Sequence, residues 1–145
     1  HRSKYENGGD FPDFLLHLML KAFRKKFGKF HYDLLLYVPP THSGDLVKNI
    51  AEKFARVIDV PISHDLLKTR ITEEQKMFQN AYSKQENIKD AFDIHANIRG
   101  KNIILIDDIY DSGATIKEIA SMLTQKGANY VTPVVIAKTV GGTPL

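Results

Sequence analysis

A chain of 145 residues with ordinary hydrophobic content is large enough for one core, so we expect residues 1–145 to form a single domain. The absence of cysteine excludes disulfides and thiolate metal sites, and the longest apolar runs are too short to span a bilayer. A formal net charge of +3 suits an anionic ligand and is too small to indicate nucleic-acid binding by itself. We therefore expect a cytoplasmic protein with no membrane segment.

The first predicted helix begins near Pro12, because proline is well suited to a first helical turn. Apolar residues recur at helical spacing over residues 14–23, and Gly28 is a natural terminator. Three basic residues lie near the end of this helix: Arg24, Lys25 and Lys26. Cations are favoured at the negative end of a helix dipole, so this cluster is better explained as a solvated helix end than as a nucleic-acid patch.

Residues 32–38 predict a strand buried on both faces, since three consecutive leucines show no polar alternation. Pro39 and Pro40 end the strand because neither nitrogen can donate a hydrogen bond. A polar loop over 41–44 and an amphipathic helix from Leu46 follow. The order is strand, loop and helix start.

The middle of the chain predicts short strands around a polar segment. Residues 60–67 contain one short strand, opened by Pro61, and residues 91–94 another. Between them, Thr72 and Gln75 have the spacing of a capping box, but no long apolar face follows. A polar stretch of this length inside a compact domain is more typical of a lid than of core.

The most informative stretch is 102–115. Four apolar residues run into Asp107 and Asp108, then into a polar turn and a helix that ends near Gly127. A run without alternation indicates a strand covered on both faces, and ligands of such sheets bind beyond the carboxyl ends of the strands. The two acids occupy such an end.

The last predicted strand covers residues 130–137, and Pro133 within it indicates that the strand begins at an edge or is irregular at that point. Strands that alternate with helices predict an α/β fold with an open, mostly parallel, twisted sheet and flanking helices.

The loop over 111–115 has the chemistry of a cradle for a phosphate monoester. Gly113 allows close backbone approach, the Ser112 and Thr115 hydroxyls can donate, and the first amides of the next helix are unsatisfied. The preceding acids would repel a phosphate, so we expect them to face sugar hydroxyls or the water shell of Mg²⁺. A phosphorylated ribose has these parts; the alternative is a strand, a turn and a helix cap with surface acids.

The run 103–115 resembles the phosphoribosyl pyrophosphate (PRPP) binding signature of type I phosphoribosyltransferases. The resemblance implies that Asp107 and Asp108 hold the ribose hydroxyls and that Mg²⁺ is the cofactor, without direct protein ligands. It places the 5-phosphate on the loop residues Asp111, Ser112, Gly113, Ala114 and Thr115.

The same resemblance implies roles elsewhere. Pyrophosphate contacts are expected from Thr41, His42, Ser43, Gly44, Lys4 and Arg70. Tyr110 and Lys138 are expected near the base. The catalytic candidates are Asp107, Asp108 and Asp111. Asp111 resembles the residue that exchanges a proton with the base in purine-salvage enzymes, although an aspartate before a helix is also a common N-cap.

Several short motifs resemble ComF-type phosphoribosyltransferases and the similar domains fused behind RecQ-type helicases. They are Lys4-Tyr5, Val38-Pro39-Pro40, Lys68-Thr69-Arg70, Lys84 with Asn87, and Ala91-Phe92. Two features depart from that pattern: the cysteine-rich segment is absent, and Ser43-Gly44 replaces an Arg-Gly pair. The second departure bears on the pyrophosphate contacts more than on the ribose contacts.

The predicted function is transfer of a phosphoribosyl group from PRPP to an unidentified nitrogen nucleophile, with release of pyrophosphate. An alternative is a PRPP- or nucleotide-sensing domain without turnover, attached to a larger protein such as a RecQ-type helicase. A receiver-like regulator is less well supported, because it leaves the small-residue cradle unexplained. A homodimer is possible on the resemblance.

Overall fold

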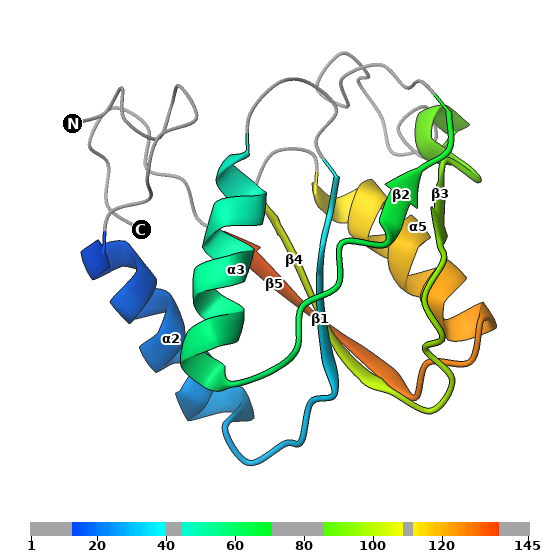
Figure 1. Cartoon of the computed structure of the whole chain (residues 1–145). Helices are drawn as coiled ribbons and strands as arrows, with labels where there is room; N and C mark the ends of the chain where they lie inside the picture. Colours follow the sequence, from blue (N-terminus) through cyan, green and yellow to red (C-terminus); the bar gives the residue numbers. More distant parts are fainter. Residues whose placement is uncertain (1–12, 40–44, 71–85, 109–111, 137–145) are drawn as a thin grey trace.

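The structure is a computed structural model that describes residues 13–39, 45–70, 86–108 and 112–136. Its helices and strands alternate along much of the chain, as the sequence predicts (Figure 1). The elements are α2 (Asp13–Phe27), β1 (Leu34–Tyr37), α3 (Leu46–Ile58), β2 (Leu66–Lys68), β3 (Phe92–Ile94), β4 (Asn102–Asp108), α5 (Ser112–Gln125) and β5 (Tyr130–Ile136).

The main sheet has three parallel strands in the order β1-β4-β5. On the other side of β1, Leu35 forms an isolated parallel bridge with Ile62. Strands β2 and β3 form a separate antiparallel pair. The predicted class, a mostly parallel α/β sheet with flanking helices, is confirmed.

Strand β4 is the centre of the fold. Its residues 103–106 are fully buried, and successive side chains point to opposite faces. Ile103 and Leu105 pack with α5, whereas Ile104 and Ile106 pack with α2 and α3. The unbroken apolar run is therefore explained by a helical layer on each face.

One of these layers is formed by α2 and α3 (Figure 1). Their contact includes Phe23 and Phe54, whose rings meet edge to face at 5.2 Å between centroids. Helix α2 ends where predicted, with the Gly28 N–H donating to the Arg24 carbonyl at 3.0 Å. A Cβ on Gly28 would overlap that carbonyl oxygen, so a residue without one is needed there.

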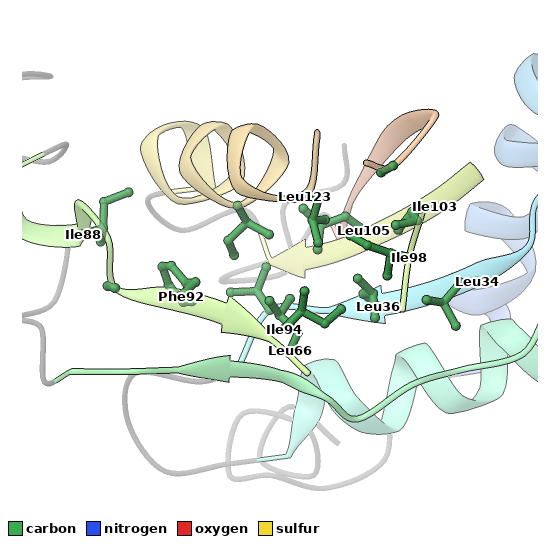
Figure 2. Packing of buried hydrophobic residues seen from close by; sticks show 14 residues of the cluster. Leu34, Leu36, Leu66, Ile88, Phe92, Ile94, Ile98, Ile103, Leu105 and Leu123 are labelled. Atoms are coloured by element: carbon green, nitrogen blue, oxygen red, sulfur yellow. The ribbon is translucent and has the colours of Figure 1, made fainter. Parts of the chain in front are cut away.

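The other layer is formed by α5 and the β2–β3 pair. Figure 2 shows apolar side chains from both filling the space against β1 and β4, including Leu66 and Phe92 from the pair and Leu123 from α5. Helix α5 is followed by Gly127, whose φ of +104° favours glycine.

Several boundaries differ from the sequence prediction. The strand expected over 60–67 is divided between the bridge at Ile62 and β2. Helix α5 begins at Ser112, within the predicted loop, because residues of the small-residue turn already adopt helical geometry. Most of the expected lid, 71–85, lies outside the described residues. Pro133 lies in β5, which is an edge strand of the three-stranded sheet, as expected.

Among the helices that the structure describes, none is long and apolar enough to cross a membrane.

A buried hydrogen bond connects the entry of β1 to β5. The hydroxyls of Tyr32 and Thr132 lie 2.9 Å apart, and both side chains are buried. We expect Tyr32→Phe to destabilise the protein by about 1–2 kcal/mol, because the Thr132 hydroxyl would lose its partner. Denaturant unfolding checks this prediction.

The control is the double variant Tyr32→Phe/Thr132→Val, which removes both polar groups and keeps the shapes. It should be more stable than Tyr32→Phe alone. If it is less stable, the hydrogen bond is not the source of the effect.

Candidate functional site

The connections of the sheet define a topological switch point between β1 and β4, a position that we call the crevice. After β1 the chain passes through α3 on one face and returns at Ile62, on the side of β1 away from β4. After β4 it passes through α5 on the opposite face and returns as β5. The two connections diverge, so the carboxyl ends of β1 and β4 flank a topological switch point, where ligands of open α/β sheets bind.

Asp107 and Asp108 lie at this crevice as the last residues of β4. The Val38 N–H, just after β1, donates to the Ile106 carbonyl at 2.9 Å, which keeps the two strand ends adjacent. Asp107 is buried, with 7% of its surface exposed, and its Oδ1 accepts the Asp108 N–H at 2.8 Å. The pair thus provides carboxylate oxygens at the end of the central strand.

The first turn of α5 supplies the complementary chemistry. Its amides have no intrahelical partner and lie at the positive end of the helix dipole. The Thr115 side chain in that turn is buried, and its hydroxyl has no hydrogen-bond partner within the described part of the chain. A buried hydroxyl without a partner is costly, so a ligand that accepts from it would be stabilised.

Gly113 is not required by packing. A Cβ at this position would meet no atom of the described residues within 4 Å, and its φ is not in the left-handed region. Alanine is better than glycine in a helix by up to about 1 kcal/mol. The glycine therefore leaves space next to the helix start, as a closely approaching ligand would need.

The structure adds Lys68, which the sequence placed within a motif without giving it a site role. Lys68 is partly buried at the end of β2, and its pKa is lowered by that burial and further by the nearby Arg70 charge. Leu66, on the same face of β2, packs in one cluster with Val38 and Ala114. Because β2 pairs with β3, which packs against α5, this places β2 in the same layer as that helix. The partial burial of Lys68 at the end of a strand indicates a site role, and this burial could not be predicted from the sequence.

Arg70 has contacts of its own. Its guanidinium donates to the Lys89 carbonyl at 2.6 and 3.2 Å and to the Glu86 carbonyl at 3.4 Å. Next to it, the Thr69 N–H donates to the Ala91 carbonyl at 2.7 Å. These bonds join the chain before residue 71 to the chain after residue 85. The predicted pyrophosphate role of Arg70 would have to be added to this structural one.

A polar group flanks the outer side of β1. The Tyr37 hydroxyl lies 2.7 Å from Nδ1 of His64, whose Nε2 lies 3.8 Å from Glu52. Burial, and then the charge of Glu52, raises the pKa of Tyr37. This contact ties the last residue of β1 to the segment that follows α3.

The structure therefore describes some of the predicted site residues and not others. Asp107, Asp108 and the first turn of α5 lie around one end of the sheet, and Arg70 lies on the stem of the β2–β3 pair. The others lie outside the described residues: Lys4, Thr41, His42, Ser43, Gly44, Tyr110, Asp111 and Lys138. For Ser112 the structure describes the helical backbone and not the side chain.

A doubly wound α/β domain with acids at the switch point and a helix start beside them is the general design of a nucleotide- or sugar-phosphate-binding protein. The sequence profile of the phosphoribosyl transferase domain matches residues 46–143, which include β4 and α5 but not β1. The chain belongs to the phosphoribosyl transferase domain family.

Solved structures support the same fold. The chain is similar to a hypoxanthine phosphoribosyl transferase of Trypanosoma cruzi, with a TM-score of 0.57 and 14% identity over 91% of this chain and 68% of that one. It is also similar to the glutamine PRPP amidotransferase of B. subtilis, with a TM-score of 0.55 and 19% identity over 90% of this chain and 27% of that one. At such identities the likeness concerns the fold.

Among curated proteins, the DNA utilization protein YhgH of Escherichia coli is 33% identical over 66 residues, which is 46% of this chain. The Salmonella typhimurium protein of the same name is 30% identical over a stretch of equal length. In both comparisons the matched stretch spans 29% of the relative's length.

The space beside Gly113 gives a test that separates ligand binding from folding. We expect Gly113→Ala to leave the melting temperature unchanged or raise it, because alanine favours the helix. Affinity for ribose 5-phosphate, measured by calorimetry, should fall at least about tenfold, because the methyl group would fill the space that a phosphate needs.

The matched control is Ser121→Ala, on an exposed position of the same helix. It makes a similar change in helix propensity and should leave affinity unchanged. A Gly113→Ala protein that binds normally would contradict the cradle.

Proposed function

We propose that this domain binds PRPP at the crevice between β1 and β4 and transfers its phosphoribosyl group to a nitrogen nucleophile. The observation that carries the proposal is the pairing of two chemistries at one end of the sheet. Carboxylates end the central strand, and a helix start follows within four residues. It has open space at Gly113 and a buried Thr115 hydroxyl that no described residue partners.

In this proposal the ribose lies between them. The carboxylates of Asp107 and Asp108 accept hydrogen bonds from the ribose hydroxyls. The amides of the first turn of α5, together with the Thr115 hydroxyl, donate to the 5-phosphate. Asp111 remains the proposed acid or base toward the nucleophile.

Mg²⁺ suits this set of residues as a shared partner of protein and substrate. No group of three or more His, Asp or Glu side chains within the described ranges could hold a metal ion. Mg²⁺ usually keeps several waters and binds substrate phosphates, so Asp107 and Asp108 would act on its water shell and not as direct ligands. When bound, the ion would neutralise charge on the pyrophosphate group.

The chain's own contribution is positioning and electrostatic stabilisation. The bond from ribose C1 to pyrophosphate breaks as the bond to nitrogen forms, so positive charge develops on the sugar and negative charge on the leaving group. Asp107 and Asp108 hold the sugar in place, near the positive charge that develops on it. Lys68 and Arg70 are proposed to balance the negative charge on the leaving pyrophosphate. Burial of Lys68 makes its ammonium a stronger partner for an anion than an exposed lysine.

We expect the double variant Asp107→Asn/Asp108→Asn to lose PRPP affinity by at least about 100-fold, because the acceptors for two hydroxyls are weakened and the local charge is removed. Calorimetry with PRPP and Mg²⁺ measures the loss. Since Asn can still accept the Asp108-position N–H, the melting temperature should change little. Asp13→Asn, an exposed acid of α2, is the control. Unchanged affinity in the double variant would refute the ribose role.

A second candidate function is PRPP or nucleotide sensing without turnover. It is favoured by the curated relatives, whose name concerns DNA utilization and not transfer chemistry, and which are longer than the matched stretch. In this form the domain would respond to PRPP within a larger assembly, such as a protein with a RecQ-type helicase, or as a homodimer. The fold and crevice would be the same.

A turnover screen separates the two functions. The chain is incubated with PRPP and Mg²⁺, and each nucleobase, ammonia and simple amines are added in turn while pyrophosphate is measured. We expect release above the hydrolysis rate with one class of acceptor, and loss of that release in Asp107→Asn/Asp108→Asn. Tight PRPP binding without release by any acceptor would instead establish the sensor.

A further inference from the structure

The end of α2 and the turn after it carry a dense positive surface. Five cations lie within nine residues, and all are exposed: Lys21, Arg24, Lys25, Lys26 and Lys29. No acidic residue occurs in the sequence between Asp13 and Asp33. We call these five residues and Phe30 the α2 basic surface.

Among the residues that the structure describes, no acid balances these cations. In the described part of the chain, none of the five forms an ion pair, and Lys26 contacts the face of Phe27 at 5.4 Å from the ring centroid. The next acid, Asp33, already accepts from the Asn102 N–H and contacts the His31 ring, and these contacts hold the pKa of its carboxyl below the usual value. The helix dipole favours cations in the last turn, but it does not account for Lys29 beyond the helix end.

Phe30 lies next to these cations in the sequence, and its aromatic ring is exposed. More than half of it, 56%, is exposed, although large apolar side chains are usually buried. Its ring centroid lies 6.3 Å from that of Tyr130, which it meets edge to face, and 6.2 Å from that of Phe27. The backbone beside it is fixed, because Tyr130 and Asn102 both donate to the His31 carbonyl, at 3.1 and 3.0 Å. Phe30 is therefore held in place with a large part of its ring open.

The α2 basic surface lies away from the crevice. Strand β1 starts just after it and runs to the crevice, so the two lie at opposite ends of the sheet, as the bottom and top of Figure 1 show. The phosphoribosyl ligand cannot account for these charges. A separate anionic partner can.

We propose that the α2 basic surface binds single-stranded nucleic acid, with the cations along the phosphate backbone and Phe30 stacked on a base. Lys21 and Lys25 lie one turn apart on the outward face of α2, and Lys29 continues past its end, so the charge follows a line. A positive track beside an exposed, fixed aromatic ring is the arrangement used by sequence-tolerant single-strand binders. A base inside a duplex is already stacked on its neighbours, so the ring favours single strands over duplexes. The inference does not depend on the proposed phosphoribosyl transfer.

The test is fluorescence anisotropy with the 145-residue chain and a labelled oligothymidylate of about 15 nucleotides, a length that covers one single-strand site. We expect binding that weakens steeply with salt. The variant Lys25→Gln/Lys29→Gln should bind about tenfold more weakly and lower the slope of log affinity against log salt by about 0.7 for each phosphate that is no longer neutralised. Phe30→Leu should weaken binding about fivefold or more, whereas Phe30→Tyr, which keeps the ring, should bind like the parent protein.

The charge control is Lys117→Gln, an exposed lysine on α5 across the sheet, which should not change binding. Melting curves establish that each variant is folded, and PRPP affinity should be the same in all of them. The proposal is overturned if the oligonucleotide does not bind at low salt, or if a duplex of the same length binds as tightly. It is also overturned if Phe30→Leu has no effect, if Lys117→Gln weakens binding as much as the paired change, or if anionic vesicles compete as well as the oligonucleotide.

Discussion

The burial of β4 on both faces is the constraint on which the rest of the structure depends. A strand with Ile103, Ile104, Leu105 and Ile106 fully buried needs an apolar layer on each side. The chain meets this need by passing α3 over one face and α5 over the other. Connections on opposite faces diverge at the strand ends, and this divergence creates the crevice that Asp107 and Asp108 flank. The packing of apolar side chains thus determines where a polar ligand can bind.

The sequence allowed the main sheet to be predicted because its signals are local. The three leucines of β1 and the apolar run of β4 indicate strands without knowledge of their partners, and Pro133 indicated an edge. The β2–β3 pair was harder to predict. Its strands have three residues each and are separated by a long stretch of chain, so their pairing depends on tertiary packing against α5.

The candidate site divides in the same way. The acids and the first turn of α5 could be predicted from the residues between Asp107 and Thr115, because adjacency in sequence brings them together. The partial burial of Lys68 could not, since it arises from the layer that β2 forms with distant parts of the chain. Likewise, sequence alone explains the basic cluster of α2 as a solvated helix end. Its significance depends on Phe30, Tyr130 and Asn102, which only the fold brings to the same place.

The bonds of Arg70 and Thr69 have a consequence for how this protein can vary. Arg70 and Thr69 donate to the carbonyls of Lys89 and Ala91. These hydrogen bonds hold positions 69–70 next to positions 89–91, whatever residues lie between them in the sequence. Insertions or deletions between these anchor points leave the bonds at positions 69 and 70 in place, and the entropy of closing a longer connection rises only slowly with its length. Homologues can therefore differ in chain length between positions 70 and 86 without disturbing β2 and β3.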